Sequence, residues 1–230
     1  FSLEMDAASK EDEFNCYLLY RLSNIVISPT ELRSTDHPID EKILDLLESE
    51  EYQKYITAFK NLVTFVETER NPTGINKYCR AYAEEHGHYN YVTVKGKNSV
   101  TGEPEDIRIL DPDEPWTAND PEEIKIAILD NASNLQTEQG LNKMQTIEKM
   151  SKYFITLRNQ MNWVTVLIQH QAQAQEGIEN FKLNKIKPSS DGLADCKTTT
   201  RDANMVIGLY SPFKYEIENY EHYDIRKFRN

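Results

Sequence analysis

Two short apolar runs, separated by a stretch of helical periodicity, constrain the fold of this chain more than any other feature. Residues 124–130 (IKIAILD) and 164–170 (VTVLIQH) are almost continuously apolar, and residues 144–161 between them have the spacing of an amphipathic helix. Strands that are apolar on both faces are typical of mainly parallel sheets covered by helices. The pattern therefore predicts an α/β fold, with further strands at 205–210 (MVIGLY) and 223–228 (YDIRKF).

The chain before residue 124 predicts helices and one hairpin. Helices are expected at residues 6–22 and 71–87, and the acidic segment 40–67 is expected to form one or two more. The helix at 71–87 begins near Pro72 and stops at Gly87. Residues 89–121 alternate like strands, turn at Gly96 and Gly102, and end in a loop rich in proline and aspartate. We interpret this segment as a β-hairpin inserted into a single domain that spans 1–230.

Composition limits the classes of function. The 230 residues carry 38 acidic and 26 basic side chains, a net charge of −12, which argues against a generally basic nucleic-acid coat but not against a local basic loop. No apolar run approaches the ~18 residues of a membrane span. Cys16, Cys79 and Cys196 show no paired spacing, which indicates reduced thiols in a cytoplasmic protein. His86 and His88 are the only close pair of histidines, and they are weak evidence for zinc.

Polar side chains end three candidate strands. Glu4 closes FSLEM at residues 1–5, Asp130 closes the run at 124–130, and His170 closes the run at 164–170. Ligands of open α/β sheets bind at the carboxyl ends of the strands. A carboxylate to orient water, a second for Mg²⁺ and a polar sensor are the groups that hydrolysis of a nucleotide γ-phosphate needs. Each also has a simpler explanation, namely a helix-capping carboxylate or a hydrogen-bonded polar strand end.

A phosphate-binding glycine-rich loop is missing from the sequence. The only Gly-Lys pair is Gly96-Lys97, which lies in the predicted hairpin and is followed by Asn98. It is not a Walker A motif, because it lacks the glycine-rich turn before the lysine and the hydroxyl residue after it. Residues 1–230 alone are therefore expected to hold a nucleotide poorly.

Several blocks, in order, resemble the motor domain of DnaB-type replicative helicases, which are hexameric RecA-like ATPases. They are FSLEM, TGINKYCRAYAEEHG, IKIAILDN, MNWVTVLIQHQ, KPSSDGLADCKTTTRDANMVIGLY and IRKFRN. The resemblance implies a RecA-like P-loop NTPase core, and it places Walker A upstream of Phe1. It further implies ATP and Mg²⁺ as ligands, single-stranded DNA as the track, and a homo-hexamer that a primase or a helicase loader contacts.

The resemblance also assigns roles at the nucleotide. Glu4 would deprotonate the attacking water, and Asp130 would bind Mg²⁺ through water. His170 stands where the family often has glutamine, as a sensor of the γ-phosphate. Lys227 and Arg229 match a finger pair that reaches the nucleotide of the neighbouring subunit, where the guanidinium fork suits phosphate oxygens. Their alternative is a solubilising role on an edge strand.

DNA contact is expected from loops that face the central channel. Residues 194–197 align with the family's DNA-gripping loop, usually Arg-Glu-Ser-Gly, but here Ala194, Asp195, Cys196 and Lys197. Three lysines precede them, Lys182, Lys185 and Lys187, which would neutralise phosphates or simply solvate a loop. The segment from 136 to 143 is a second candidate.

The sequence departs from the family pattern at the 89–121 insertion, and two other functions remain as alternatives to the helicase. The insertion at 89–121 is an extra element that favours a phage-encoded helicase in the bacterial or infected-host cytoplasm, with the hairpin docking a partner. A non-catalytic RecA-like scaffold or regulator is the first alternative, and a recombinase-type ATPase of the same superfamily is the second. The spelling of FSLEM favours the helicase over the recombinase.

Overall fold

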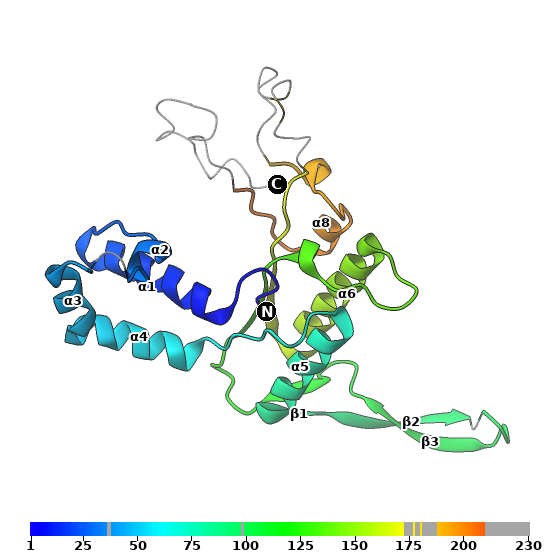
Figure 1. The fold of residues 1–230 in the computed structure, drawn as a ribbon. Helices are drawn as coiled ribbons and strands as arrows, with labels where there is room; N and C mark the ends of the chain where they lie inside the picture. Colours follow the sequence, from blue (N-terminus) through cyan, green and yellow to red (C-terminus); the bar gives the residue numbers. More distant parts are fainter. Residues whose placement is uncertain (36–37, 98, 173–176, 178–179, 181–187, 210–230) are drawn as a thin grey trace. The chain divides into compact units, whose positions relative to one another are not determined.

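A computed structural model describes residues 1–35, 38–97, 99–172, 177, 180 and 188–209. The chain divides into two compact units, Phe1–Glu69 and Arg70–Asn230, as shown in Figure 1. The first unit is helical, and the described part of the second combines helices with three two-stranded sheets. The described residues are therefore mixed α/β.

Residues 1–35 and 38–69 of the first unit form four helices whose ends follow local capping rules. They are α1 (Ala7–Ser23), α2 (Pro29–Leu32), α3 (Glu41–Glu48) and α4 (Glu50–Leu62). The side chain of Asp6 accepts a hydrogen bond from the backbone N–H of Ser9 and so caps α1. Ser49 is both the last cap of α3 and the first cap of α4, which is why the acidic stretch forms two helices rather than one.

The core of the first unit lies between α1 and α4. Leu18, Leu19 and Tyr52 are buried, and partly buried leucine and isoleucine side chains surround them. The N-terminal segment runs beside the chain that follows α4, since the N–H of Ser2 donates to the carbonyl of Val66 over 3.2 Å. In the segment predicted as a strand end, a single β-bridge at Ser2 is present and no strand.

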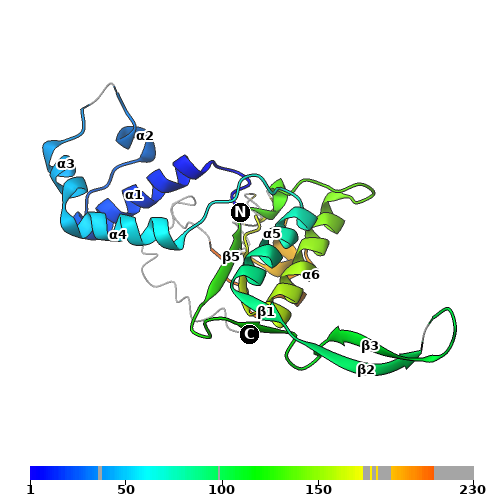
Figure 2. The same cartoon turned by 90° about the horizontal axis from the view of Figure 1, so that it is seen from below.

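The second unit is built around one β-α-β connection. Strands β5 (Lys125–Leu129) and β6 (Trp163–Leu167) pair in parallel, from Lys125 opposite Trp163 to Leu129 opposite Leu167. Helix α6 (Lys143–Met161) joins them, and α5 (Pro72–Glu85) packs beside α6, as Figure 2 shows. These elements confirm the predicted helices and the two apolar strands.

Within the part of the chain that the structure describes, the parallel pair buries the side chains of one face and exposes those of the other. Along β5, Lys125, Ala127 and Leu129 are buried, whereas Ile126 and Ile128 are 56% and 48% exposed. On β6, Val164 and Val166 are exposed in the same way. Helix cover on the second face of the sheet, and hence a full RecA-like core, stays a prediction.

Two antiparallel pairs occupy the segment from 87 to 118. Strand β1 (Gly87–Tyr89) pairs with β4 (Trp116–Ala118), and β2 (Tyr91–Lys97) pairs with β3 (Pro104–Leu110). Gly87 is required at the first pair, because a Cβ there would collide with the indole of Trp116 and the carbonyl of Thr117. The two pairs follow one another, so that the β2–β3 hairpin projects from the end of the β1–β4 ribbon (Figure 1).

One predicted strand is not formed. Residues 205–209 belong to no strand, and Met205, Val206, Ile207 and Leu209 are exposed. An apolar run predicts burial, but a strand exists only when a neighbouring strand pairs with it. The predicted strand at 223–228 lies outside the described residues.

The described helices do not offer a membrane span. None of them combines the length and the hydrophobicity that a crossing requires.

Candidate functional site

The carboxyl ends of β5 and β6 lie side by side. Backbone hydrogen bonds continue past the strands, from the N–H of Ile168 to the carbonyl of Leu129 (3.0 Å) and from the N–H of Ala132 to the carbonyl of Ile168 (2.9 Å). Asp130 and His170, which end the two runs predicted to meet, are therefore at the same edge of the sheet. The edge is where α/β sheets place their ligands.

Asn131 joins the two strand ends through its side chain. Its amide nitrogen Nδ2 lies 2.9 Å from Nε2 of His170. This contact is a hydrogen bond between the amide and the imidazole, and the tautomer of His170 decides which nitrogen carries the proton. Asn131 is 1% exposed, and the peptide bond between Asp130 and Asn131 is cis. The sensor position is thus fixed by the residue that directly follows the predicted Mg²⁺ ligand.

The segment predicted to grip DNA runs back along the end of β6. The N–H of Ala194 donates to the carbonyl of His170 over 3.0 Å, and that of Ala172 donates to the carbonyl of Gly192 over 2.7 Å. Gln171 and Leu193 form an antiparallel bridge between these bonds. Residue 170 is therefore bonded to the loop through its backbone as well as to β5 through its ring.

Side chains tie the same loop to both strands. Nε2 of Gln169 donates to the carbonyl of Cys196 (2.7 Å), and Oε1 of Gln169 accepts from the hydroxyl of Thr199 (3.0 Å). On the β5 side, the hydroxyl of Ser133 donates to the carboxylate of Asp195. We name this set the strand-end junction: Asn131, Ser133, Gln169, His170 and residues 193–199.

Helix α6 holds the far side of the loop. Glu148 accepts from the hydroxyl of Thr198 over 2.9 Å, and the hydroxyl of Ser151 donates to Asp202 over 2.6 Å. Asp202 ends the short helix α8 (Thr199–Asp202). Arg158 donates to the carbonyl of Asp202 over 3.1 Å. The loop is consequently attached to β5, β6 and α6.

The segment from 136 to 143, the second candidate for DNA contact, turns its main cation inward. Nζ of Lys143 donates to the carbonyls of Ser133 (3.0 Å) and Leu135 (2.6 Å), which closes the turn η1 (Ala132–Asn134). In the same segment Glu138 accepts from Lys149 and from the N–H of Thr73. Lys143 therefore stabilises the turn after β5 and is a poor phosphate contact.

Opposing effects set the pKa values of the Glu138–Lys149 pair. Partial burial acts to raise the pKa of Glu138, but the hydrogen bonds from Lys149 and Thr73 outweigh it and leave that pKa below its ordinary value. The hydrogen bond to Glu138 raises the pKa of Lys149. Both shifts favour the charged pair, which joins the start of α5 to α6.

The predicted site residues fall into three groups. Asp130 and His170 meet at the sheet edge, with Asp195 beside them through Ser133 and Lys197 exposed in the same loop. Glu4 is exposed and belongs to the first unit. The remaining five lie outside the described residues: Lys182, Lys185, Lys187, Lys227 and Arg229.

A preformed metal cage is not part of this edge. Among the residues that the structure describes, no three histidine, cysteine or acidic side chains come together as a metal-binding group. Mg²⁺ at phosphate-transfer sites is held by one or two carboxylates, water and substrate phosphates rather than by a full protein cage. The half-buried Asp130, directly after β5, fits that kind of site as its single protein ligand.

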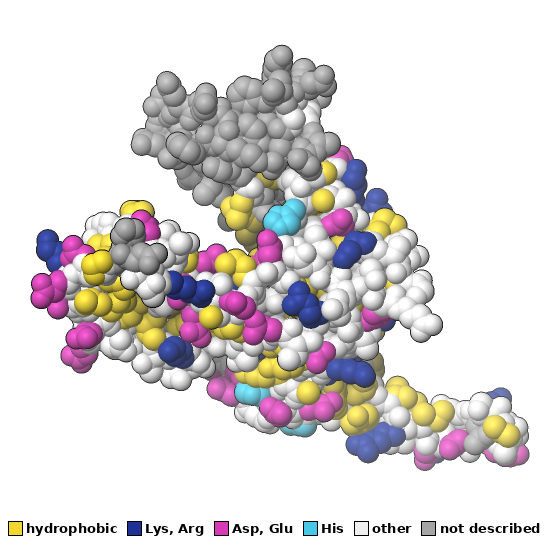
Figure 3. Space-filling model, viewed as in Figure 1, with side chains coloured by type: hydrophobic (Ala, Val, Ile, Leu, Met, Phe, Trp, Pro, Cys, Tyr) yellow, Lys and Arg dark blue, Asp and Glu magenta, His cyan; other side chains and the backbone are white. Residues whose placement is uncertain are grey.

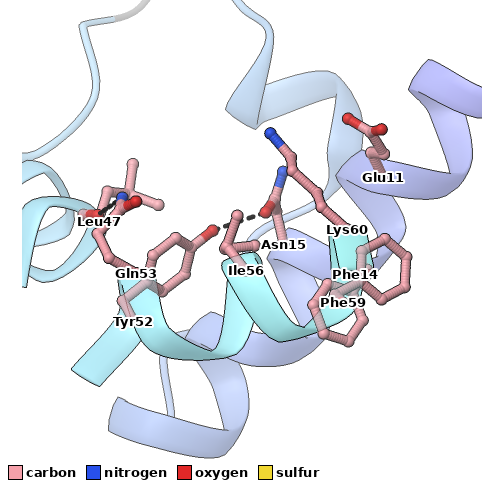
Figure 4. A pocket seen from close by; sticks show the side chains of 9 residues that line it. All are labelled: Glu11, Phe14, Asn15, Leu47, Tyr52, Gln53, Ile56, Phe59 and Lys60. Carbon is pink, nitrogen blue, oxygen red and sulfur yellow. Dashed lines mark hydrogen bonds between the residues drawn. The ribbon is translucent and has the colours of Figure 1, made fainter. Parts of the chain in front are cut away.

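The hollow in the first unit is a weaker candidate. It has a volume of about 230 Å³ and lies between α1 and α4, where Phe14 and Phe59 stack with ring centroids 3.9 Å apart (Figure 4). The hydroxyl of Tyr52 donates to Asn15 across it over 2.7 Å, and burial raises the pKa of Tyr52 to about 12. Ligand pockets usually exceed ~300 Å³, and this one contains none of the predicted site residues.

Sequence reasoning assigned no role to three residues of the strand-end junction, Asn131, Ser133 and Gln169. Gln169 precedes the predicted sensor, and Ser133 follows the predicted Mg²⁺ ligand. Their partners are 27 and 62 residues away along the chain. For Gln169 the signal in the sequence is a polar residue near the end of an apolar run, whereas Ser133 lies beyond β5 in the turn η1 and has no such signal.

Comparison with protein-family models, with curated proteins and with solved structures finds no match to this chain.

Proposed function

We propose that this chain is part of the motor of a DnaB-type replicative DNA helicase, which hydrolyses ATP between the subunits of a ring while it moves along single-stranded DNA. The proposal includes Mg²⁺ as the metal, a homo-hexamer as the assembly and the bacterial or infected-host cytoplasm as the location. Two things support it: the order of the sequence blocks, and the contacts at the carboxyl ends of β5 and β6.

The strand-end junction is the observation that supports this proposal best. A motor must connect the site where the γ-phosphate is lost to the loop that holds the track. Here the predicted sensor His170 is bonded to the β5 end through Asn131 (2.9 Å) and to the predicted DNA loop through Ala194 (3.0 Å). A displacement of Asn131 at the end of β5 would therefore reach Ala194 in the predicted DNA loop through His170 alone.

Each residue then has a chemical task. Glu4 would take a proton from the attacking water, and Asp130 would hold Mg²⁺, which would supply charge stabilisation at the phosphates. Arg229 and Lys227 of one subunit stabilise the charge that develops on the phosphate held by its neighbour. His170, whose ring is hydrogen-bonded to Asn131, is the polar sensor of the γ-phosphate.

A RecA-like scaffold without catalysis is the second candidate. The exposed position of Glu4 favours it, because an exposed carboxylate is usually only a solvated surface group, and the cap of α1 is Asp6. The two candidates differ in what the Glu4 carboxylate does to bound ATP, and this difference can be measured.

Replacement of Glu4 by glutamine separates them. In the full polypeptide, E4Q is expected to lower ATP turnover at least ~100-fold, because general-base catalysis contributes factors of that size, while nucleotide binding stays intact. E51Q is the matched control, since Glu51 is an exposed glutamate of the same unit, in the first turn of α4. Equal turnover above background in E4Q, E51Q and wild type would remove Glu4 from the mechanism, whereas turnover at background in all three would favour the scaffold.

A further inference from the structure

The loop at 193–199, which is predicted to grip DNA, directs its one carboxylate toward the turn after β5. Asp195 is half-buried and accepts a hydrogen bond from the hydroxyl of Ser133. Ala194 before it and Lys197 after it are exposed. Because a carboxylate repels phosphate, Asp195 is suited to hold the loop, and Lys197 is the side chain of this loop that can neutralise a phosphate.

The surface next to the loop carries further basic side chains. Lys197 precedes α8, and Arg201 within α8 is exposed as well. Figure 3 shows basic side chains over the region of α8 and α6, with acidic side chains between them. Lysine and arginine supply most of the sequence-independent affinity of proteins for nucleic acid. The loop thus offers cations to solvent while its carboxylate is held within the second unit.

Ser133 connects this carboxylate to the proposed metal ligand. It lies three residues after Asp130, in the turn η1, where the N–H of Asn134 donates to the carbonyl of Asn131 over 3.1 Å. Because this bond closes the turn directly after Asp130, a shift of Asp130 on metal binding would carry the turn with it. The hydroxyl that holds Asp195 would then move as well.

The other bonds that hold the loop start from different elements. Gln169 holds it from β6, beside the predicted sensor, and Glu148 holds it from α6. The bond from Ser133 starts from the turn that follows the proposed metal ligand. It therefore belongs to the metal side of the strand-end junction, whereas Gln169 belongs to the sensor side.

We propose that the Ser133–Asp195 hydrogen bond makes the affinity of the loop for single-stranded DNA depend on Mg²⁺ and nucleotide at Asp130. Ser133 and Asp195 are positioning residues in this account, and Lys197 is the residue that contacts DNA. The inference rests on the proposed function and adds to it the contact that carries the coupling. Coupling between two sites is reciprocal, so DNA must change the affinity for Mg²⁺-nucleotide by the same factor.

A second serine of the same unit provides a matched control. The hydroxyl of Ser151 donates to Asp202 over 2.6 Å, and Asp202 ends α8, which directly follows the loop. S133A and S151A therefore each remove one hydroxyl-to-carboxylate bond that holds this part of the chain. They differ in the anchor, which is the turn after β5 for Ser133 and helix α6 for Ser151.

The measurement is the Kd of the full polypeptide for a fluorescent single-stranded DNA, with and without Mg²⁺ and a non-hydrolysable ATP analogue. In wild type, Mg²⁺-nucleotide is expected to change this Kd by about fivefold or more, the usual size of coupling between sites. In S133A the change should fall below about twofold, whereas S151A should keep the wild-type ratio. S133T retains a hydroxyl and should restore most of the coupling.

A double-mutant cycle tests whether the two residues act as one contact. S133A removes the donor and D195A removes the acceptor, so the double variant should lose no more coupling than either single variant. Additive losses would show that Ser133 and Asp195 act independently and would contradict the inference.

Hydrogen exchange of the unmodified protein gives a test that does not depend on how a variant folds. Addition of Mg²⁺ and the ATP analogue is expected to change the exchange of peptides that cover 131–135 and 193–199 together. A change at 131–135 with none at 193–199 would show that the turn moves without the loop.

The outcomes separate this inference from the proposed function. If wild type couples DNA to Mg²⁺-nucleotide and S133A keeps the full ratio, or if S151A loses as much as S133A, the motor stands and the Ser133–Asp195 contact is not its coupling. If wild type binds neither DNA nor Mg²⁺-nucleotide, or binds both without any effect of one on the other, the proposed function itself fails.

Discussion

Gln169 makes two hydrogen bonds to the predicted DNA loop, although it sits one residue before the position that family resemblance marks as the sensor. Its amide donates to the carbonyl of Cys196, and its carbonyl accepts from Thr199. The nitrogen and the oxygen of the Gln169 amide are thus both hydrogen-bonded, and the side chain is half-buried. Removal of the amide would leave the Cys196 carbonyl and the Thr199 hydroxyl without these bonds. At the residue scale, Gln169 is the side chain that most directly positions the loop against β6.

Replacement of Gln169 by leucine should uncouple the loop from the strand. We expect Q169L to keep ATP turnover without DNA within about threefold of wild type and to lose most of the stimulation by single-stranded DNA, because the strand end remains but its link to the loop is lost. The measurement is ATP turnover with and without DNA. Q160L is the control, because Gln160 is at the end of α6 that leads into the start of β6, opposite the junction. Full DNA stimulation in Q169L would show that Gln169 is only structural.

The cysteines should differ in reactivity. All three are free, and Cys79 is 0% exposed inside α5, where burial raises the pKa of its thiol to about 12. Burial and the nearby Glu31 raise the pKa of Cys16 as well, but this thiol is only half-buried. Because the thiolate is the reactive form, we expect a thiol reagent at pH 8 to modify Cys16 well before Cys79 in the folded protein. Mass spectrometry of the labelled peptides measures both rates, and equal rates without denaturant would contradict the burial of Cys79.

At the scale of elements, α6 organises the second unit. One end begins after the turn closed by Lys143, its side packs against α5 and β6, and its polar residues hold the loop and α8. Glu138 extends this arrangement, because it bonds the N–H of Thr73 at the start of α5 and Lys149 on α6. The polar contacts of α6 and of the turn before it therefore hold α5 and α8 in place, which the two-stranded sheet does not contact in this way.

The Glu138–Lys149 pair predicts how stability depends on pH. The pKa of Glu138 is lowered by folding, so its contribution is present above the ordinary value of 4.5 and is lost as pH falls through the lower folded-state pKa. The pKa of Lys149 is raised, so its contribution is present below 10.5 and is lost as pH rises through the higher folded-state value. Between these limits the charged pair stabilises the fold.

E138Q should therefore lower the free energy of unfolding at pH 7 by about 1 kcal/mol, a modest value because the Lys149 side chain is 33% exposed and solvent screens the pair. The difference from wild type should narrow as pH falls below 4.5. Urea unfolding followed by tryptophan fluorescence measures this in the second unit, which contains both tryptophans, Trp116 and Trp163. The exposed Glu122 supplies the control E122Q. A difference that is constant from pH 7 to the acid limit would contradict the assignment.

The sequence predicted local elements well and long-range contacts poorly. Asn71, Pro72 and Gly87 mark the limits of α5, and the structure places its cap at Asn71 and its last residue at Glu85. The run at 205–209 was predicted as a strand from its apolar residues, yet pairing depends on a partner that composition does not specify. A hairpin was predicted at 89–121, but its division into two antiparallel pairs was not.

The candidate site shows the same limit. Asp130 and His170 could be placed at one edge because parallel strands end together. The contacts of Gln169 and Ser133 with the loop join residues far apart in the chain, and one of them ends on a backbone carbonyl, which no residue type identifies. Such contacts follow from the packed fold and not from local pattern.

At the scale of the whole molecule, apolar surface and acidic charge occur together. The second unit exposes Ile126 and Val164 on one sheet face and Val94 and Ile107 on the hairpin, while the chain carries a net charge of −12. Exposed apolar faces of this kind mark interaction sites. An assembly of copies around a nucleotide would use such faces, and the proposed ring is one assembly of this kind.

The most direct test of the central claim is ATP turnover by the full polypeptide, measured with Mg²⁺ in the presence and absence of single-stranded DNA. A helicase motor predicts hydrolysis that depends on Mg²⁺, rises severalfold with DNA, and falls to background in D130N, since Asp130 is the proposed metal ligand. Turnover that stays at background in wild type, with DNA and Mg²⁺ both present, would contradict the motor and leave the scaffold as the better account.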